Sequence, residues 1–246
     1  TSTVSTDVTD DADATTVTLT ASTASVAEGG SIIYTATVNH AVTDAPLVIT
    51  LDNGKTITIP VGDSTADSTA YTVRADDFYV QGTDTLTVGI TGTTGGNFEA
   101  LTTTSTVSTD VTDDADATTV TLTGVTVDEG SGTAMVTGSL DHTPGTELVV
   151  TLSNNATITF GTNYDPGTEV NSTAFAIANA EDVLNDASSF DVTAASSTGG
   201  NFENLVGVGG DNPASATVTV DDTIDATTLT LTGVTVDEGS GTAMVT

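Results

Sequence analysis

The stretch that decides the fold is Val111-Thr112-Asp113-Asp114-Ala115-Asp116-Ala117-Thr118-Thr119, a dense group of acids between two segments rich in Thr and Val. A nearly identical stretch spans residues 8–16, and a variant spans residues 220–228. Thr and Val favour strands, whereas Asp favours turns. Each stretch therefore predicts a joint between the last strand of one domain and the first strand of the next.

Longer repeats set the spacing of these joints. Residues 1–9 match residues 104–112 exactly, and residues 118–136 return at 227–245 with a single Val-to-Leu change. A period a little over a hundred residues is too long for a solenoid unit and is typical of an array of independent domains. The chain opens inside a repeat and not at Met, so we expect it to be a piece of a longer protein. We predict four parts: the end of a preceding repeat with its linker (1–13), two complete repeats (14–116 and 117–225) and the start of a following repeat (226–246).

Within the first complete repeat, apolar and polar residues alternate in short segments, and no stretch shows a helical period. The expected strands lie at 15–20, 31–38, 47–51, 55–59, 68–73, 85–90 and 102–111. Asn53-Gly54 marks a tight hairpin. Seven short strands in about a hundred residues indicate an immunoglobulin-like β-sandwich. The predicted fold is all-β: tandem immunoglobulin-like Greek-key β-sandwich domains joined by short, acidic, calcium-binding linkers.

The charge of the chain restricts its partners. Among 246 residues there are 34 acids and two bases, Lys55 and Arg74, which gives a formal charge of −32. Nucleic acids and anionic membrane surfaces are therefore disfavoured, because binding to either depends on clustered Lys and Arg. No run approaches the ~20 apolar residues of a membrane helix, so we predict no membrane insertion. The chain has no cysteine, which excludes disulfides and thiolate chemistry.

The Greek-key topology predicts where the acids meet. The first-to-second and fifth-to-sixth loops of such a domain lie at the end where the last strand exits. In the first repeat these segments carry Glu28, Asp76, Asp77, Asp113, Asp114 and Asp116, and in the second they carry Glu129, Glu181, Asp182, Asp221, Asp222 and Asp225. The joint that precedes the first repeat carries Asp10, Asp11 and Asp13. The sixth-to-seventh loop of the following domain is expected to add one more ligand to each joint, Asn97 from the first repeat and Asn201 from the second.

Clustered carboxylates repel one another unless some are protonated or a cation lies among them. Ligands that are all oxygen, with no Cys and no nearby His, select a hard ion, and calcium fits best. Such an ion would tie a domain, its linker and the next domain together. The alternative interpretation is an acidic, solvated linker that only keeps the chain soluble.

Other motifs carry less chemistry. The repeated Gly-Gly-Asn-Phe-Glu motif is either a ligand contact or a turn whose Phe packs on the core, and the turn is favoured. His40 and His142 occupy equivalent loop positions and are expected to be exposed. No Gly-X-Ser-X-Gly elbow or catalytic triad is present, so we predict no enzyme and no specific small-molecule substrate.

Several motifs together resemble the extender repeats of giant bacterial RTX adhesins, the large-adhesion-protein type of biofilm formers exported by type I secretion. They are Val-Ala-Glu-Gly-Gly-Ser-Ile-Ile-Tyr, Leu-Asp-Asn-Gly-Lys-Thr-Ile-Thr-Ile, Ala-Asp-Asp-Phe-Tyr and Asp-Asp-Ala-Asp-Ala-Thr-Thr. The second repeat departs at Glu181, where the first has Asp. The joints are also similar to those of cadherins.

The resemblance implies an extracellular, outer-membrane-anchored stalk, made rigid by calcium, that carries adhesive modules away from the cell. Its partners would be calcium and the neighbouring repeats of the same chain. The alternative is a binding module whose repeats themselves bind a glycan, a surface or a neighbouring adhesin. That alternative requires an exposed aromatic or apolar patch in one set of loops.

Overall fold

The computed structural model describes residues 2–9, 11–179 and 181–246. The chain divides into two compact units, Thr1–Asp116 and Ala117–Thr246. Both are built almost entirely of strands, and the only helical element among the described residues is a short 3-10 turn, η1 (Glu129–Ser131). None of the described helices has the length and apolar character needed to cross a membrane.

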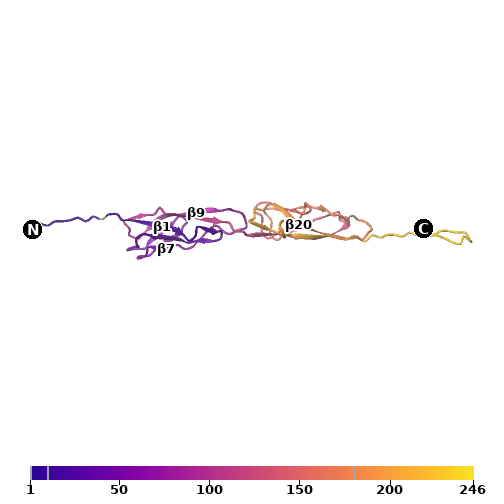
Figure 1. The fold of residues 1–246 in the computed structure, drawn as a ribbon, viewed down its shortest axis with the longest axis horizontal. Helices are drawn as coiled ribbons and strands as arrows, with labels where there is room; N and C mark the ends of the chain where they lie inside the picture. Colours follow the sequence, from indigo (N-terminus) through magenta and orange to yellow (C-terminus); the bar gives the residue numbers. More distant parts are fainter. Residues whose placement is uncertain (1, 10, 180) are drawn as a thin grey trace. The chain divides into compact units, whose positions relative to one another are not determined.

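Unit 1 is a sandwich of two sheets, as Figure 1 shows with β1 and β7 in one layer and β9 in the other. The strands of the first sheet, in spatial order, are β10 (Ala100–Thr102), β1 (Ala14–Ala21), β4 (Tyr34–Val38) and β7 (Thr65–Asp67). The strands of the second are β2 (Ser25–Ala27), β11 (Thr106–Thr112), β9 (Asp84–Thr94), β5 (Leu47–Leu51) and β6 (Thr56–Ile59). A separate pair is formed by β3 (Ser31–Ile32) and β8 (Tyr71–Thr72).

The chain of unit 1 crosses repeatedly between the two sheets, and among these crossings are those from β4 to β5, from β6 to β7 and from β7 to β9. Most pairs are antiparallel, but β2 joins β11 and β10 joins β1 in parallel. Repeated crossing between two sheets is the Greek-key plan of immunoglobulin-like sandwiches, which confirms the predicted fold class.

The core lies between the two sheets because inward and outward residues alternate along each strand. β1 shows this pattern, with Val17 and Leu19 buried between exposed threonines. Ile49 faces Ile57 across the β5–β6 hairpin, and both are fully buried. Phe98 packs against this core, and Phe202 packs against the core of unit 2. The favoured interpretation of the Gly-Gly-Asn-Phe-Glu motif, a turn whose Phe covers the core, is therefore confirmed.

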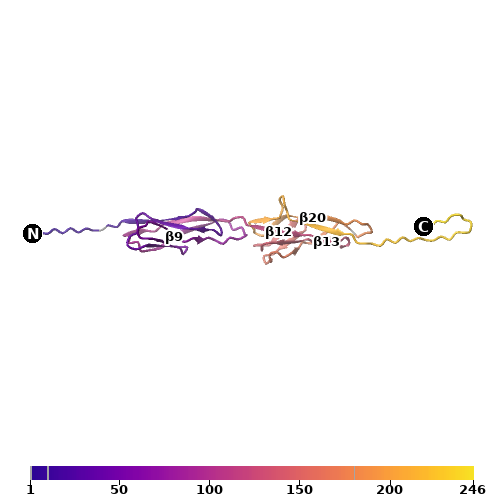
Figure 2. The same ribbon diagram turned by 90° about the horizontal axis from the view of Figure 1, so that it is seen from below.

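Unit 2 repeats the plan, and Figure 2 shows β12, β13 and β20 within it. One sheet has the order β18 (Val170–Asn171), β15 (Thr137–Leu140), β12 (Ala117–Thr123) and β21 (Asn204–Val206). The other has the order β13 (Val125–Asp128), β22 (Ser215–Asp221), β20 (Ser188–Gly199), β16 (Leu148–Leu152) and β17 (Thr157–Phe160). The pair β14 (Thr133–Ala134) and β19 (Phe175–Ala176) corresponds to β3 and β8.

The registers of the two units fix which residues correspond. Val111 pairs with Val26 in unit 1, and Val220 pairs with Val127 in unit 2. Counting onward from these pairs, Glu28 corresponds to Glu129 and Asp113 to Asp222. These equivalences allow the acidic ends of the two units to be compared residue by residue.

Candidate metal centres

Three carboxylates meet at one end of unit 1, from three separate segments. Glu28 follows β2, Asp76 lies between β8 and β9, and Asp114 follows β11. One oxygen from each lies within 4.8 Å of the others. We call this group the unit 1 cluster. The loops that the topology assigned to one end of the domain do converge there.

Glu28 is the buried member of this cluster, and its side chain is fully inaccessible to solvent. Its Oε2 accepts a hydrogen bond from Nε of Arg74 at 2.8 Å, while its Oε1 is buried with no hydrogen-bond partner. A buried carboxylate oxygen without a partner is costly, since the lost hydration is not replaced. It therefore points to a ligand that binds among these acids.

The other two members lie where charge accumulates. Desolvation, together with the negative charges of Asp116, Asp114, Glu28 and Asp77, raises the pKa of Asp76 above its ordinary value. Burial thus disfavours the ionised form of Asp76, and the neighbouring ionised carboxylates repel it as well. A divalent cation would reverse that repulsion.

Gly29 allows the Asp76 loop to approach the Glu28 turn. Its φ is +69°, and a Cβ at this position would lie 2.9 Å from Cβ of Asp76. Glycine adopts this conformation without strain, and it leaves room for the acidic loop. The Glu-Gly sequence at the turn thus brings two of the three carboxylates together.

Substitution of Gly29→Ala should destabilise unit 1 by about 1–3 kcal/mol, because it adds a left-handed alanine and a clash with Asp76. Gly54→Ala is the matched control, since its φ is +80° and nothing lies within 4 Å of the added Cβ. Both variants carry the strain of a left-handed alanine, but only Gly29→Ala adds the clash with Asp76, so calorimetry of both separates the strain from the clash. Gly29→Ala should also weaken calcium binding, whereas Gly54→Ala should leave it unchanged. Equal calcium affinities would contradict this role for Gly29.

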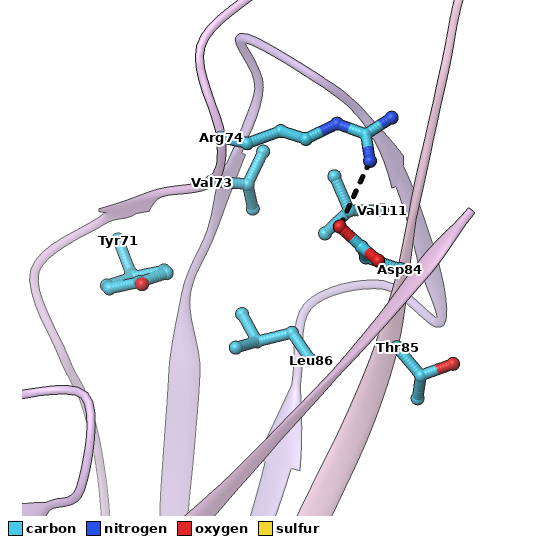
Figure 3. Close-up of a pocket in the computed structure, with 7 residues that line it drawn as sticks. All are labelled: Tyr71, Val73, Arg74, Asp84, Thr85, Leu86 and Val111. Carbon is cyan, nitrogen blue, oxygen red and sulfur yellow. Dashed lines mark hydrogen bonds and ion pairs between the residues drawn. The ribbon is translucent and has the colours of Figure 1, made fainter. Parts of the chain in front are cut away.

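Arg74 is the residue whose role the sequence did not reveal. It is one of only two bases in the sequence, and it lies within the acidic end of unit 1. Figure 3 shows the ion pair between Arg74 and Asp84. Nη1 of Arg74 lies 3.2 Å from Oδ2 of Asp84, and Nη2 lies 2.5 Å from Oδ1 of Asp113 and 2.8 Å from the carbonyl oxygen of Gly82. A hollow of about 190 Å³ lies beside Arg74 and Asp84, and its other lining residues are Tyr71, Val73, Thr85, Leu86 and Val111. The guanidinium therefore supplies positive charge to the same end as the unit 1 cluster.

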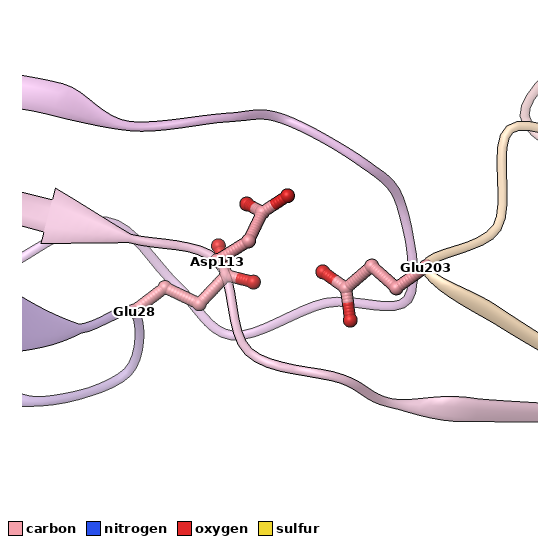
Figure 4. Close-up of side chains that lie close together, drawn as sticks. All are labelled: Glu28, Asp113 and Glu203. Carbon is pink, nitrogen blue, oxygen red and sulfur yellow. The ribbon is translucent and has the colours of Figure 1, made fainter.

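Asp113 lies beside Glu28, as Figure 4 shows, but both of its oxygens have partners within unit 1. Oδ1 accepts from Arg74, and Oδ2 accepts from the backbone N–H groups of Gln81 and Gly82 at 2.8 and 3.1 Å. These backbone bonds, followed by the charge of Arg74, hold the pKa of Asp113 below its ordinary range. Asp113 therefore fixes the loop before β9. Glu203, also drawn in Figure 4, belongs to unit 2.

Three carboxylates also meet in unit 2: Glu129 after β13, Asp186 before β20 and Asp222 after β22. One oxygen from each lies within 4.8 Å of the others, and we call this group the unit 2 cluster. Glu129 is 1% exposed, and its Oε2 is buried without a partner. Both units thus place an unpartnered glutamate oxygen at the same position of the fold.

Thr223 donates two hydrogen bonds to Oε1 of Glu129. Its backbone N–H lies 3.1 Å from Oε1, and its hydroxyl lies 2.9 Å from that oxygen and 2.6 Å from Oε1 of Glu181. One hydroxyl proton serves only one carboxylate at a time. The bonds from Thr223 lower the pKa of Glu129, which favours its ionised form.

Asp186 was not among the predicted ligands. Desolvation raises its pKa most, followed by the hydrogen bond with Glu129 and the charges of Asp182, Glu129 and Asp222. Its backbone N–H donates to Oδ1 of Asp222 at 3.2 Å, as that of Gly82 does to Asp113 in unit 1. Asp186 therefore stands at the position of Gly82 and adds a carboxylate there. Its place two residues before a strand was the available signal in the sequence.

The remaining predicted ligands lie outside these two clusters. Asp77 binds within its own turn, with Oδ1 accepting from the N–H of Tyr79, and Asp182 accepts similarly from the N–H of Leu184. Asp116 adds charge near Asp76. Asp221 is exposed at the end of β22, and Asp225 is exposed beyond it. All five acids, with Glu181, remain predictions as metal ligands.

At the opposite end of unit 1, Asp13 and Asn97 line a shallow hollow together with Glu99 and His40. The N–H of Asp13 donates to Oε2 of Glu99 at 2.7 Å, and His40 lies 3.2 Å from the Thr15 hydroxyl. Asn97 and Asn201 both have a positive φ, of 51° and 55°, in their turns. Asp11 is exposed, and Asp10 lies outside the described residues.

Comparison with known proteins gives one family. The model of the LapA domain matches the chain twice, over residues 13–114 and 116–223. No curated protein matches it.

Two solved structures show a remote similarity to this chain. One is the crystal structure of CBD12 from CALX1.2, with 10% identity and a TM-score of 0.30 over 80% of this chain and 96% of that one. The other is the crystal structure of calcium binding domain CBD12 of CALX1.1, with 10% identity and a TM-score of 0.32 over 79% and 95%. Likenesses this remote carry no conclusion about the ligand.

Proposed function

Because this chain belongs to the LapA domain family, the extender domains of LapA-type large adhesins, we propose that it is a stalk segment of a surface adhesin that calcium stiffens. A calcium ion at the acidic end of each unit would hold the segment that leaves that unit. The protein would act by its length and stiffness and not by catalysis. It would project adhesive modules for surface attachment and biofilm formation.

The observation that carries this proposal is the buried, unpartnered glutamate oxygen in each unit. Glu28 Oε1 and Glu129 Oε2 each lie among further carboxylates. Such an oxygen gains a partner when a cation binds beside it, and the repulsion between its neighbours falls at the same time. An ordinary solvated linker has no reason to bury a glutamate.

The chemistry of the donors favours calcium over other ions. Each cluster contains only carboxylate oxygens, and the chain has no cysteine. Hard, oxygen-rich sites suit calcium, which accepts six to eight ligands in flexible geometry. Magnesium demands a tighter octahedral arrangement and keeps several waters. The three carboxylates of each cluster would act as the protein ligands.

Stiffening follows from where the ligands lie in the chain. In unit 1, Glu28 and Asp76 belong to turns of the folded domain, whereas Asp114 belongs to the segment that leads away from β11. An ion bound to all three would fix the outgoing backbone to the body of the domain. In unit 2, Asp222 occupies the same kind of position after β22. Further ligands of the kind predicted at Asn97 and Asn201 would extend this restraint to the neighbouring repeat.

The family supports the remaining parts of the proposal. An adhesin of this kind works at the outside of the cell, where calcium is at millimolar concentration, and extracellular modules bind it with Kd values of ~0.1–1 mM. We extend this to an outer-membrane-anchored RTX adhesin exported by type I secretion.

Small-angle X-ray scattering of the full chain tests the proposal. In about 10 mM calcium, a hundredfold excess over a Kd of ~0.1 mM, we expect one narrow distribution of interdomain distances. After calcium removal the distribution should broaden and its mean should shorten. Magnesium at the same concentration is the control for ionic strength. Identical profiles in all three buffers would contradict calcium stiffening and leave the acids as a solvated linker.

A further inference from the structure

The acidic ends of the two units differ most in their positive charge. In unit 1, Arg74 contacts Glu28, Asp84 and Asp113. Lys55 is the only other basic residue of the chain, and it also lies in unit 1. Unit 2 therefore contains no Lys or Arg. The side chain of Arg74 is only 17% exposed, so it is largely buried at this end of the domain.

The registers identify what replaces Arg74 in unit 2. Ile32 pairs with Tyr71 in unit 1, and Ala134 pairs with Phe175 in unit 2. Three residues after these aromatic residues stand Arg74 and Ala178. Alanine offers no charge and no hydrogen bond to the glutamate.

The partners of Arg74 change with it. Asp84 and Ser188 occupy equivalent positions, since they pair with Val111 and Val220. The acid that binds Arg74 through Nη1 in unit 1 is therefore a serine in unit 2. Unit 2 therefore lacks both members of the Arg74–Asp84 ion pair, so the acidic ends of the two units differ by a complete ion pair.

Unit 2 gains acids elsewhere at the same end. The β2–β11 pair Ala27–Thr112 corresponds to the β13–β22 pair Asp128–Asp221, in which two carboxylates stand on paired strands. Asp186 replaces Gly82, as described above. Like charges on directly paired residues destabilise a sheet. The end of unit 2 is thus more negative than that of unit 1 and has no resident positive charge.

We propose that Arg74 is a resident cation of the unit 1 cluster and that unit 2, which lacks one, binds calcium more tightly and depends on it more. This inference rests on the proposed calcium function. Arg74 gives Glu28 a partner in the absence of metal, and it also repels an incoming dication. The single chain then carries two calcium sites with different thresholds, set by one residue.

The repulsion gives the size of the effect. A guanidinium and a dication about 6 Å apart repel each other. Even at the dielectric constant of bulk water, this repulsion weakens calcium binding about tenfold. We define the calcium midpoint of a unit as the calcium concentration that gives half of the maximal rise in its melting temperature. The calcium midpoint of unit 2 should therefore be about tenfold lower than that of unit 1.

Calorimetry of the full chain over a calcium series tests this inference. The two melting transitions are assigned with Ile57→Val and Ile158→Val, which trim equivalent, fully buried residues in the two cores. Arg74→Ala should lower the calcium-free melting temperature of unit 1 and lower its calcium midpoint about tenfold. Arg74→Lys keeps the charge and should retain a midpoint near that of the wild type. Unit 2 should not change in either variant.

A reciprocal variant covers the case in which Arg74→Ala does not fold without calcium. Ala178→Arg combined with Ser188→Asp places the pair in unit 2, where it should raise the calcium midpoint about tenfold. An unchanged unit 1 midpoint in Arg74→Ala, or equal midpoints for the two wild-type units, would overturn this inference alone. A wild-type chain in which neither transition responds to calcium would overturn the proposed function as well.

Discussion

Removal of calcium is expected to lower the melting temperature of the more calcium-dependent unit by about 10 °C. At a hundredfold excess over its Kd, an ion that binds only the folded state adds ~2.7 kcal/mol, and 1 kcal/mol shifts the midpoint of a domain of this size by about 4 °C. The measurement is calorimetry of the full chain, which compares its melting temperature in about 10 mM calcium with that in calcium-free buffer. The hundredfold excess assumes a Kd near 0.1 mM.

The effect is large because the stability of a domain is small. A unit of this size is stabilised by ~5–15 kcal/mol in total. A monovalent salt matched for ionic strength is the control, since general screening also relieves repulsion between acids. If sodium chloride raised the midpoint as much as calcium, the stabilisation would come from screening, and no specific site would be required.

The fold and the convergence of the acids were accessible from the sequence for physical reasons. Alternation with period two marks strands because one face of each strand is buried, and Val17 and Leu19 follow this rule. A Greek-key sandwich brings fixed loops to fixed ends, so Glu28, Asp76 and Asp114 could be assigned to one end before the structure was known. The parallel pairing of β2 with β11 was not foreseen, because three residues carry too little pattern to indicate a strand.

The partners of single charged residues were not accessible. Arg74 contacts three carboxylates from segments that are far apart in the chain. Glu28 follows β2, Asp84 begins β9 and Asp113 follows β11. Asp186 was missed since the second repeat has a different loop there, and only the register places it at the position of Gly82. Periodicity identifies faces of strands, but it does not identify which side chains meet across a loop.

Local sequence also does not determine strand formation here. Residues 104–112 contain β11, whereas the identical residues within 2–9 form no strand. The difference is the partner, since β11 lies between β2 and β9. A Thr/Val-rich segment becomes a strand only when another strand satisfies its backbone groups.

Asp186→Asn should change the stability of unit 2 in opposite directions with and without calcium. The pKa of Asp186 is raised, chiefly by desolvation and then by Glu129 and nearby charges. A raised pKa means that this group favours the folded state below its unfolded value of ~3.9, and that this contribution is lost as the pH rises through the folded pKa. At pH 7 without calcium the ionised carboxylate therefore opposes folding, and asparagine should raise the melting temperature.

With calcium the sign reverses, because the same carboxylate is then a ligand. Loss of one charged ligand should weaken binding at least tenfold, since even the partners that orient ligands cost 10–100-fold when they are removed. The calcium-induced rise in melting temperature should shrink accordingly. Asp191→Asn is the matched control, because Asp191 is not a predicted ligand and its Oδ1 accepts from the hydroxyl of Thr217, as an amide oxygen also does. If both variants retained the full calcium response, Asp186 would not be a ligand. A cation site built from mutually repelling carboxylates requires the opposite result: only Asp186→Asn loses the calcium response, and its metal-free unit is more stable.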